Sequence, residues 1–87
     1  MIYLAEFYLP AGSSLAGAVQ RARAGAGQAT AAGADVAFLG AVFVPQDETC
    51  FALYRAGSPP EVAAAGTLAG FAFDRVAGAT VSLETGP

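Results

Sequence analysis

Three side chains of the 87-residue sequence could carry out acid–base chemistry together, namely Glu6, Tyr54 and Arg55. Glu6 is the one charged residue in an apolar stretch over residues 2–9, where a carboxylate either finds a partner or has its pKa raised. Such a group suits a general acid or base, and Tyr54 or Arg55 would then stabilise a developing oxyanion. The alternative is structural, with Glu6 and Arg55 forming an ion pair between neighbouring strands.

Four other residues could line a binding site for a small apolar molecule, namely Tyr8, Phe38, Gly40 and Val42. The Tyr8 hydroxyl would orient a ligand while its ring lines the site. Phe38 and Val42 share one alternating face of the apolar segment 36–44. Gly40 removes a side chain from the middle of this segment, as a bulge, a close backbone approach or a ligand would require. Packing in the core or in an interface is the alternative role for these residues.

The composition argues against several other kinds of site. The sequence has no histidine, which is the commonest general base and metal ligand, so we expect no metal site. Four arginines, no lysine and seven acidic residues give a net charge of −3 and no basic surface for a phosphate backbone. The glycine-rich segment 25–27 lacks the lysine and the strand-to-helix context of a phosphate-binding loop. We therefore expect neither a cofactor nor a nucleic-acid partner.

Hydropathy also argues against a membrane span or a secretory signal. The longest apolar run, residues 36–44, is about half of the ~18 residues that a spanning helix requires. Glu6 interrupts the apolar N-terminal stretch, and no Lys or Arg precedes it. Cys50 is the single cysteine, which agrees with a reducing compartment. We expect a cytoplasmic protein without a membrane partner.

Gly, Pro and Ser residues divide the chain into six predicted elements. Ser13 or Ser14 caps the first helix, whose three internal glycines cost about 1 kcal/mol each, so fraying around residues 25–27 is an alternative. Ser58 followed by Pro59 and then Glu61 is a strong start for the second helix. The predicted elements are a strand over residues 2–9, a helix up to 32, strands over 36–44 and 49–55, a helix from 59 to about 70, and a strand over 75–83.

The order of these elements predicts the fold. A β-α-β-β-α-β sequence in one domain over residues 1–87 is typical of an α+β, ferredoxin-like fold, with both helices on one face of a four-stranded antiparallel sheet. Segment 36–44 is apolar on both of its faces, and 55% of all residues are apolar while only 13% are charged. The uncovered sheet face therefore needs a cover, and we expect a second copy of the chain to provide it in a homodimer or a larger homo-oligomer.

Short motifs are spread over nearly the whole chain. They are residues 3–6 followed by Leu9-Pro10, residues 51–56 followed by Ser58-Pro59, and residues 74–76. In these motifs the sequence resembles a bacterial family of small ferredoxin-like domains of unknown function that includes a nickel-binding protein. The resemblance implies this fold, self-association, and Glu6 as the acid of the first strand.

The same resemblance does not bring nickel binding with it. In that family the second strand commonly carries an aromatic residue and, two positions later, a histidine that belongs to the metal site. Here Phe38 matches the aromatic residue, but Gly40 stands where the histidine would be. The resemblance therefore implies the fold for this chain but not a nickel site.

Three functions fit these observations. The first is a homo-oligomeric module that binds a small apolar or aromatic molecule at the uncovered sheet face. The second is a cofactor-independent enzyme of the dimeric α+β barrel type, such as a small oxygenase, cyclase or isomerase, with Glu6 as its acid or base. The third is an assembly subunit without a ligand. A Glu6→Gln change separates the first two, because a binding module would keep its affinity whereas the enzyme would lose activity with binding intact.

Overall fold

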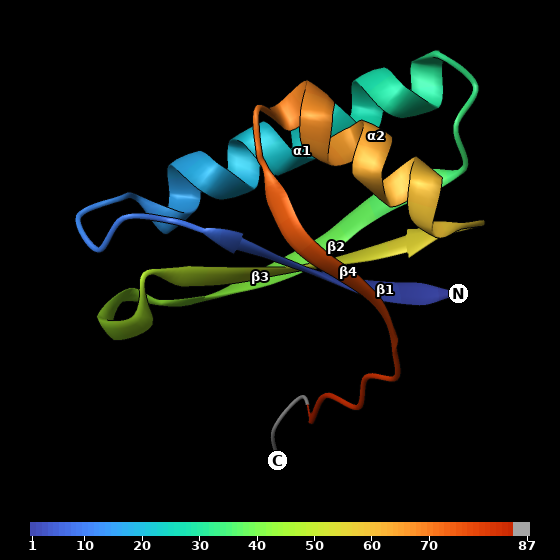
Figure 1. Ribbon diagram of the computed structural model, residues 1–87. Coiled ribbons are helices and arrows are strands. Elements are labelled where there is room, and N and C mark those ends of the chain that lie inside the picture. The colour runs from blue at the N-terminus through green and yellow to red at the C-terminus, as the bar shows by residue number, and fades with distance from the viewer. Residues whose placement is uncertain (85–87) are drawn as a thin grey trace.

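A four-stranded sheet carries two helices on one of its faces (Figure 1). The computed structural model describes residues 1–84. The strands lie in the order β2-β3-β1-β4, and each neighbouring pair is antiparallel. This is the ferredoxin-like α+β fold that the sequence predicts. In chain order the elements are β1 (Ile2–Tyr8), α1 (Leu15–Ala31), β2 (Val36–Val44), the 3-10 turn η1 (Pro45–Asp47), β3 (Thr49–Ala56), α2 (Pro59–Ala69) and β4 (Phe73–Ala79).

Helix α1 is continuous through its glycines. Ser14 caps it by accepting a hydrogen bond from the backbone N–H of Gly17 at 3.1 Å. Gly25 does not fray the helix, because α2 lies so close that a Cβ at this position would be 2.5 Å from the carbonyl oxygen of Ala65. Gly25 is therefore the point at which the two helices touch. Neither helix in residues 1–84 is long and apolar enough to cross a membrane.

Helix α2 begins after Ser58, as predicted, and ends at Gly70 in the left-handed conformation with φ of +80°. The bonds at its start differ from those of a capping box. The Ser58 hydroxyl donates to Glu61 Oε1 at 3.0 Å, and Glu61 Oε2 accepts from the backbone N–H of Asp35. Glu61 thus ties the start of α2 to the loop that precedes β2.

Arg21 of α1 holds the other end of α2. Its Nε donates to the carbonyl oxygen of Ala69 and its Nη2 to that of Gly70, both at 3.1 Å. The guanidinium also lies 4.6 Å from the centre of the Phe71 ring. A cation at this place satisfies the last carbonyl groups of the helix and complements its dipole.

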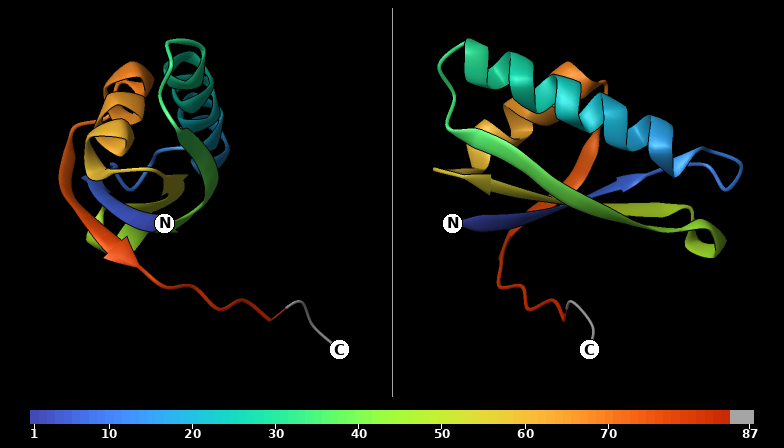
Figure 2. Two further views of the ribbon diagram at one scale, coloured as in Figure 1. Left: turned by 90° about the vertical axis from the view of Figure 1, so that its right-hand side faces the viewer. Right: turned by 180° about the vertical axis from the view of Figure 1, so that it is seen from behind.

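The core fills the space between the sheet and the helices (Figure 2). Alternate strand residues point into it, and alanines of both helices close over them. Phe7 stacks on Phe71 with ring centres 4.3 Å apart. Within residues 1–84 no charged side chain is buried, and the buried side chains with a polar group are aromatic or the thiol of Cys50. The strand residues of the core are Tyr3, Ala5, Phe7, Val36, Cys50, Ala52, Tyr54 and Ala56.

A bulge divides β2 into two halves of opposite alternation. The register with β3 shifts between Phe38, which lies opposite Tyr54, and Gly40, which lies opposite Leu53. Because the extra residue, Leu39, reverses the alternation, Phe38 packs against the core while Val42 lies on the uncovered face. The prediction that Phe38 and Val42 share a face is therefore wrong.

Strand β4 is shorter than predicted at its C-terminal end. It pairs with β1 as far as Ala79, which lies opposite Ile2, the first residue of β1. Beyond Ile2 the ladder has no further β1 residue to pair with, so the prediction of a strand up to residue 83 is wrong. Residues 80–84, here called the strap, leave the sheet edge and pass across its uncovered face instead (Figure 2).

We predict that Gly25→Ala lowers the free energy of unfolding by about 2 kcal/mol, because the new methyl group forces the helices apart. Gly27→Ala is the matched control on the same helix, since a Cβ there would have nothing within 4 Å. It should raise stability by up to about 1 kcal/mol through helix propensity. Urea denaturation followed by circular dichroism measures both, and equal effects of the two changes would contradict the close helix contact.

Candidate functional site

The sheet face opposite the helices is largely apolar and has no helix over it (Figure 2). Side chains that alternate with the core residues of β1 and β3 stand on it, and the second half of β2 contributes Val42 and Val44. Several of these apolar side chains are exposed to solvent, and the exposed fraction is 62% for Tyr8, 57% for Val42 and 52% for Leu39. This surface, here called the open face, also carries Ile2, Leu4, Glu6, Phe51, Leu53, Arg55, Arg75, Ala77 and Ala79.

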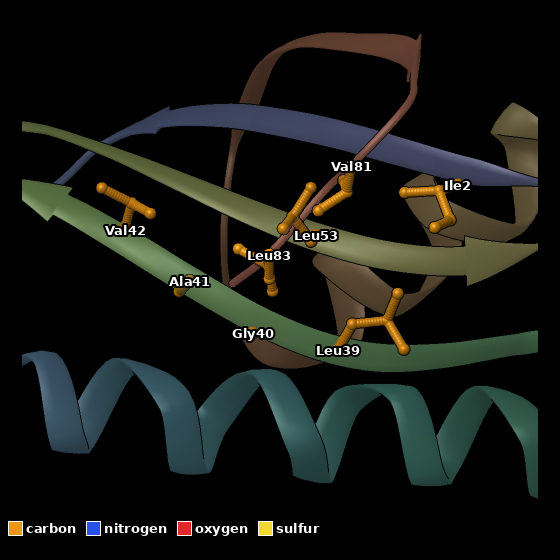
Figure 3. Close-up of a pocket in the computed structure, with 8 residues that line it drawn as sticks. All are labelled: Ile2, Leu39, Gly40, Ala41, Val42, Leu53, Val81 and Leu83. Carbon is orange, nitrogen blue, oxygen red and sulfur yellow. The ribbon is translucent and has the colours of Figure 1, made fainter. Parts of the chain in front are cut away.

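A hollow of about 500 Å³ lies on the open face (Figure 3). Its floor comes from β1, β2 and β3, and its outer wall comes from Val81 and Leu83 of the strap. None of the lining side chains is charged or carries a polar group, so the hollow offers mainly apolar contact and its polar atoms belong to the backbone. The lining residues are Ile2, Leu39, Gly40, Ala41, Val42, Leu53, Val81 and Leu83.

Gly40 gives the hollow much of its room. A Cβ built on Gly40 would meet nothing within 4 Å, and the register places this residue opposite Leu53 on the open face. The bulge and the space that sequence reasoning offered as alternatives for Gly40 thus occur together. Any larger residue here would project into the hollow.

Glu6 stands half-buried on the open face, outside the lining of the hollow. Its register neighbours are Phe51 on β3 and Arg75 on β4. Arg55 lies opposite Ile2, about 13 Å from Glu6 at ~3.3 Å per residue. It forms an ion pair with Asp35 at 3.2 Å, so the predicted pairing of Glu6 with Arg55 is wrong.

Arg75 is the charged neighbour that sequence reasoning missed. The register between β1 and β4 shifts between Glu6 and Phe7, so that Phe73 faces Phe7 and Arg75 faces Glu6. Opposite charges directly across an antiparallel pair stabilise it by roughly 0.2–1 kcal/mol. The charge pattern of the sequence contains both residues, but only the register of β4 against β1 places them opposite each other.

Tyr54 lies on the helix side of the sheet, away from Glu6. It is fully buried, and within residues 1–84 its hydroxyl has no hydrogen-bond partner. Burial raises the pKa of Tyr54 to about 12, with a smaller contribution from neighbouring Cys50. Because Tyr54 faces the core and Arg55 binds Asp35, the structure does not bring the three proposed catalytic groups together.

The four predicted ligand-binding residues are also divided among three places. Gly40 and Val42 line the hollow, whereas Tyr8 stands exposed on the open face outside it. Phe38 lies on the helix side, 5.6 Å from the Tyr54 ring, beside a shallower hollow of about 400 Å³ between α1 and β2. Sequence reasoning missed Ile2, Leu39 and Leu53, whose only signal is their alternation with core residues.

The acidic residues and the thiol do not form a metal site. No group of three or more His, Cys, Asp or Glu side chains among residues 1–84 could hold a metal ion. Cys50 is buried in the core, and burial raises its pKa.

Comparison with known proteins supports the fold alone. No family model matches the sequence, and no curated protein matches it. A crystal structure of SCO4226 from Streptomyces coelicolor A3(2) is similar, with a TM-score of 0.75 and 20% sequence identity. The match covers 95% of this chain and 100% of that one. The arrangement of helices and strands described above is thus shared with a solved structure over almost its whole length.

We predict that Tyr54→Phe raises the free energy of unfolding by about 1 kcal/mol, because it removes a buried hydroxyl that makes no hydrogen bond. Thermal unfolding near pH 7 measures this as an increase in Tm of roughly 4–8 °C for a domain of this size. A loss of stability would contradict the unpartnered state of this hydroxyl.

The same residue predicts an alkaline loss of stability. Between pH 10 and about 12 the unfolded chain releases the Tyr54 proton while the folded chain keeps it, so stability falls as pH rises through this window. The fall attributable to Tyr54 is roughly 2 kcal/mol. Urea denaturation from pH 9 to pH 12 should show a steeper decline for the wild type than for Tyr54→Phe, and parallel declines would contradict the raised pKa.

Proposed function

We propose that this chain is a small self-associating module that binds an apolar or aromatic molecule in the hollow on its open face. The observation that carries the proposal is the hollow of about 500 Å³ whose lining side chains are all apolar. Ligand sites commonly have volumes of about 300–1,000 Å³ and mostly apolar walls. The hollow is therefore of a suitable size for a molecule of one to a few rings.

The lining supports binding more than catalysis. Catalytic sites place hydrogen-bond donors or charges where charge develops in the transition state. The hollow has none among its lining side chains, and Glu6 stands beyond its edge. The alternative of an acid–base enzyme also lacks an oxyanion group near Glu6, because Tyr54 is buried on the other side of the sheet and Arg55 pairs with Asp35 opposite Ile2.

A second copy of the chain is the partner that we propose for the rest of the open face. Four strands at ~4.8 Å spacing, each about seven residues long at ~3.3 Å per residue, present roughly 450 Å² of flat sheet. The hollow and the strap occupy part of this area, so the paired faces bury less than about 1,200 Å² in total, which is the size range of weak or transient interfaces. The patch is also as large as the largest apolar patches of typical monomers, roughly 300–600 Å².

The charges on this face suit a two-fold pairing. Glu6 and Arg75 lie opposite each other on neighbouring strands, so one copy presents both signs to an identical surface. In a two-fold interface the same patch faces itself, which allows each sign to meet its opposite. This arrangement avoids the like-charge contacts that would disfavour a dimer.

The proposal also places the chain in the bacterial family that its motifs resemble, as a member without the nickel site, since Gly40 occupies the histidine position. The resemblance to that family implies self-association, which supports the proposed pairing of open faces. We place the protein in the cytoplasm, where the single thiol of Cys50 would stay reduced.

The ligand site is tested by filling it. We expect wild-type protein to bind the rings of the amphiphilic fluorophore 1-anilinonaphthalene-8-sulfonate, with its sulfonate in water, and Gly40→Val to weaken this binding at least about tenfold by occupying the hollow. Gly78→Val is the matched control, because Gly78 also lies in a strand and has nothing within 4 Å of its Cβ, but does not line the hollow. Fluorescence titration measures the affinities, and native mass spectrometry of freshly purified protein would reveal a retained ligand. Equal binding by both variants, or none by the wild type, would refute the site.

Self-association is tested by placing a charged residue on the open face. We expect the wild type to sediment as a dimer and Tyr8→Asp, a change on the open face outside the hollow, as a monomer of 8.6 kDa, because the carboxylate would be buried against apolar surface. Leu68→Asp on α2 is the control, since Leu68 is 46% exposed on the helix layer and should leave the dimer intact. Sedimentation velocity distinguishes the species, circular dichroism confirms that both variants fold, and a monomeric wild type would overturn the paired faces.

A further inference from the structure

The strap crosses the open face from one sheet edge toward the other. It leaves β4, which is an edge strand, yet Val81 and Leu83 line the same hollow as Leu39 and Gly40 of β2, which is the opposite edge strand (Figures 1 and 3). The hollow is therefore bounded by the sheet on one side and by the strap on the other. Without the strap, the floor would be an open sheet surface.

The strap is held weakly compared with the sheet. Among the described residues, no hydrogen bond and no ion pair involves residues 80–84. Val81 is 39% exposed and Leu83 is 80% exposed, so apolar contact with the face is partial. A segment with few buried contacts and no backbone bonds opens at a small fraction of the free energy of global unfolding.

Leu83 is also placed to gain from an occupant of the hollow. It lines the hollow and yet keeps most of its surface in water. An apolar molecule in the hollow would give Leu83 a surface to cover, whereas the open position of the strap offers no such contact. A ligand that contacts the strap only when it is closed must shift the strap toward the closed state.

We propose that the strap is a movable lid over the hollow, which swings aside to admit an apolar ligand and closes on it through Leu83. This inference rests on the proposed binding function and names the element that controls it. The floor residues fix the size of the ligand site, and the strap sets how long a ligand stays. Leu83 is then a residue that determines affinity, although it belongs to no helix or strand.

A glutamate-specific protease reports the position of the strap directly. Glu84 is exposed in the strap, but a protease that cleaves after it must bind the residues that precede it, so Val81 and Leu83 have to leave the hollow first. Cleavage follows the population of the open strap when opening is fast. We expect saturating 1-anilinonaphthalene-8-sulfonate to slow cleavage after Glu84 at least about threefold, as measured by mass spectrometry, at a protease concentration that leaves the rest of the chain intact. An unchanged or faster rate with the fluorophore bound would overturn the lid.

A pair of variants tests Leu83 itself. Leu83→Ser should weaken fluorophore binding about tenfold, chiefly through faster dissociation measured by stopped flow, because it removes the apolar contact that closes the lid. Leu68→Ser, an exposed leucine of α2, should bind as the wild type does. If Leu83→Ser keeps full affinity while Gly40→Val loses it, the lid is wrong and the proposed ligand site stands. If the wild type does not bind the fluorophore, both are wrong.

Discussion

The close contact between α1 and α2 places both helices on one face of the sheet, and the rest of the structure depends on this arrangement. Gly25 lets α1 approach the backbone of α2, and Gly66 leaves room for the Phe73 ring, whose Cζ would lie 2.6 Å from a Cβ at that position. Both helices consequently fit on one side of four strands, where the aromatic core rings gather (Figure 2). Every alternate strand residue is then left on the far side without a helix to cover it, and all candidate function lies there.

One extra residue in β2 determines the composition of that far side. The bulge at Leu39 directs Phe38 toward Tyr54 in the core and brings Gly40 and Val42 to the open face. With regular alternation, Phe38 and Val42 would share one face. The bulge thus places a glycine in the floor, and the hollow exists because no side chain fills the space above Gly40.

The sequence contains enough information for the elements and much less for the site. Ser14, Ser58 and Gly70 mark helix ends through local chemistry, and the bounds of β2 follow from its apolar run. The two bulges follow from pairing between distant strands, which side-chain periodicity does not reveal. The register of β4 against β1 is hidden in the same way, so the sequence predicts a pairing of Glu6 with Arg55 instead of Arg75, and a strand over residues 80–83 although β1 has no partner for them. Val81 and Leu83 alternate as strand residues do, so their sequence resembles that of a strand.

The two proposed occupants of the open face need not exclude each other. The hollow and the strap occupy the part of the open face near Ile2, Leu53 and Gly40, which belong to the neighbouring strands β1, β3 and β2. Tyr8, at the C-terminal end of β1, lies outside the hollow and faces Thr49 at the far end of β3. A partner sheet that packs on this far end would bury apolar surface that the strap does not reach, and would exclude water from the edge of the hollow. Exclusion of water strengthens apolar binding in a hollow whose walls make no hydrogen bond, so self-association and ligand binding would favour each other.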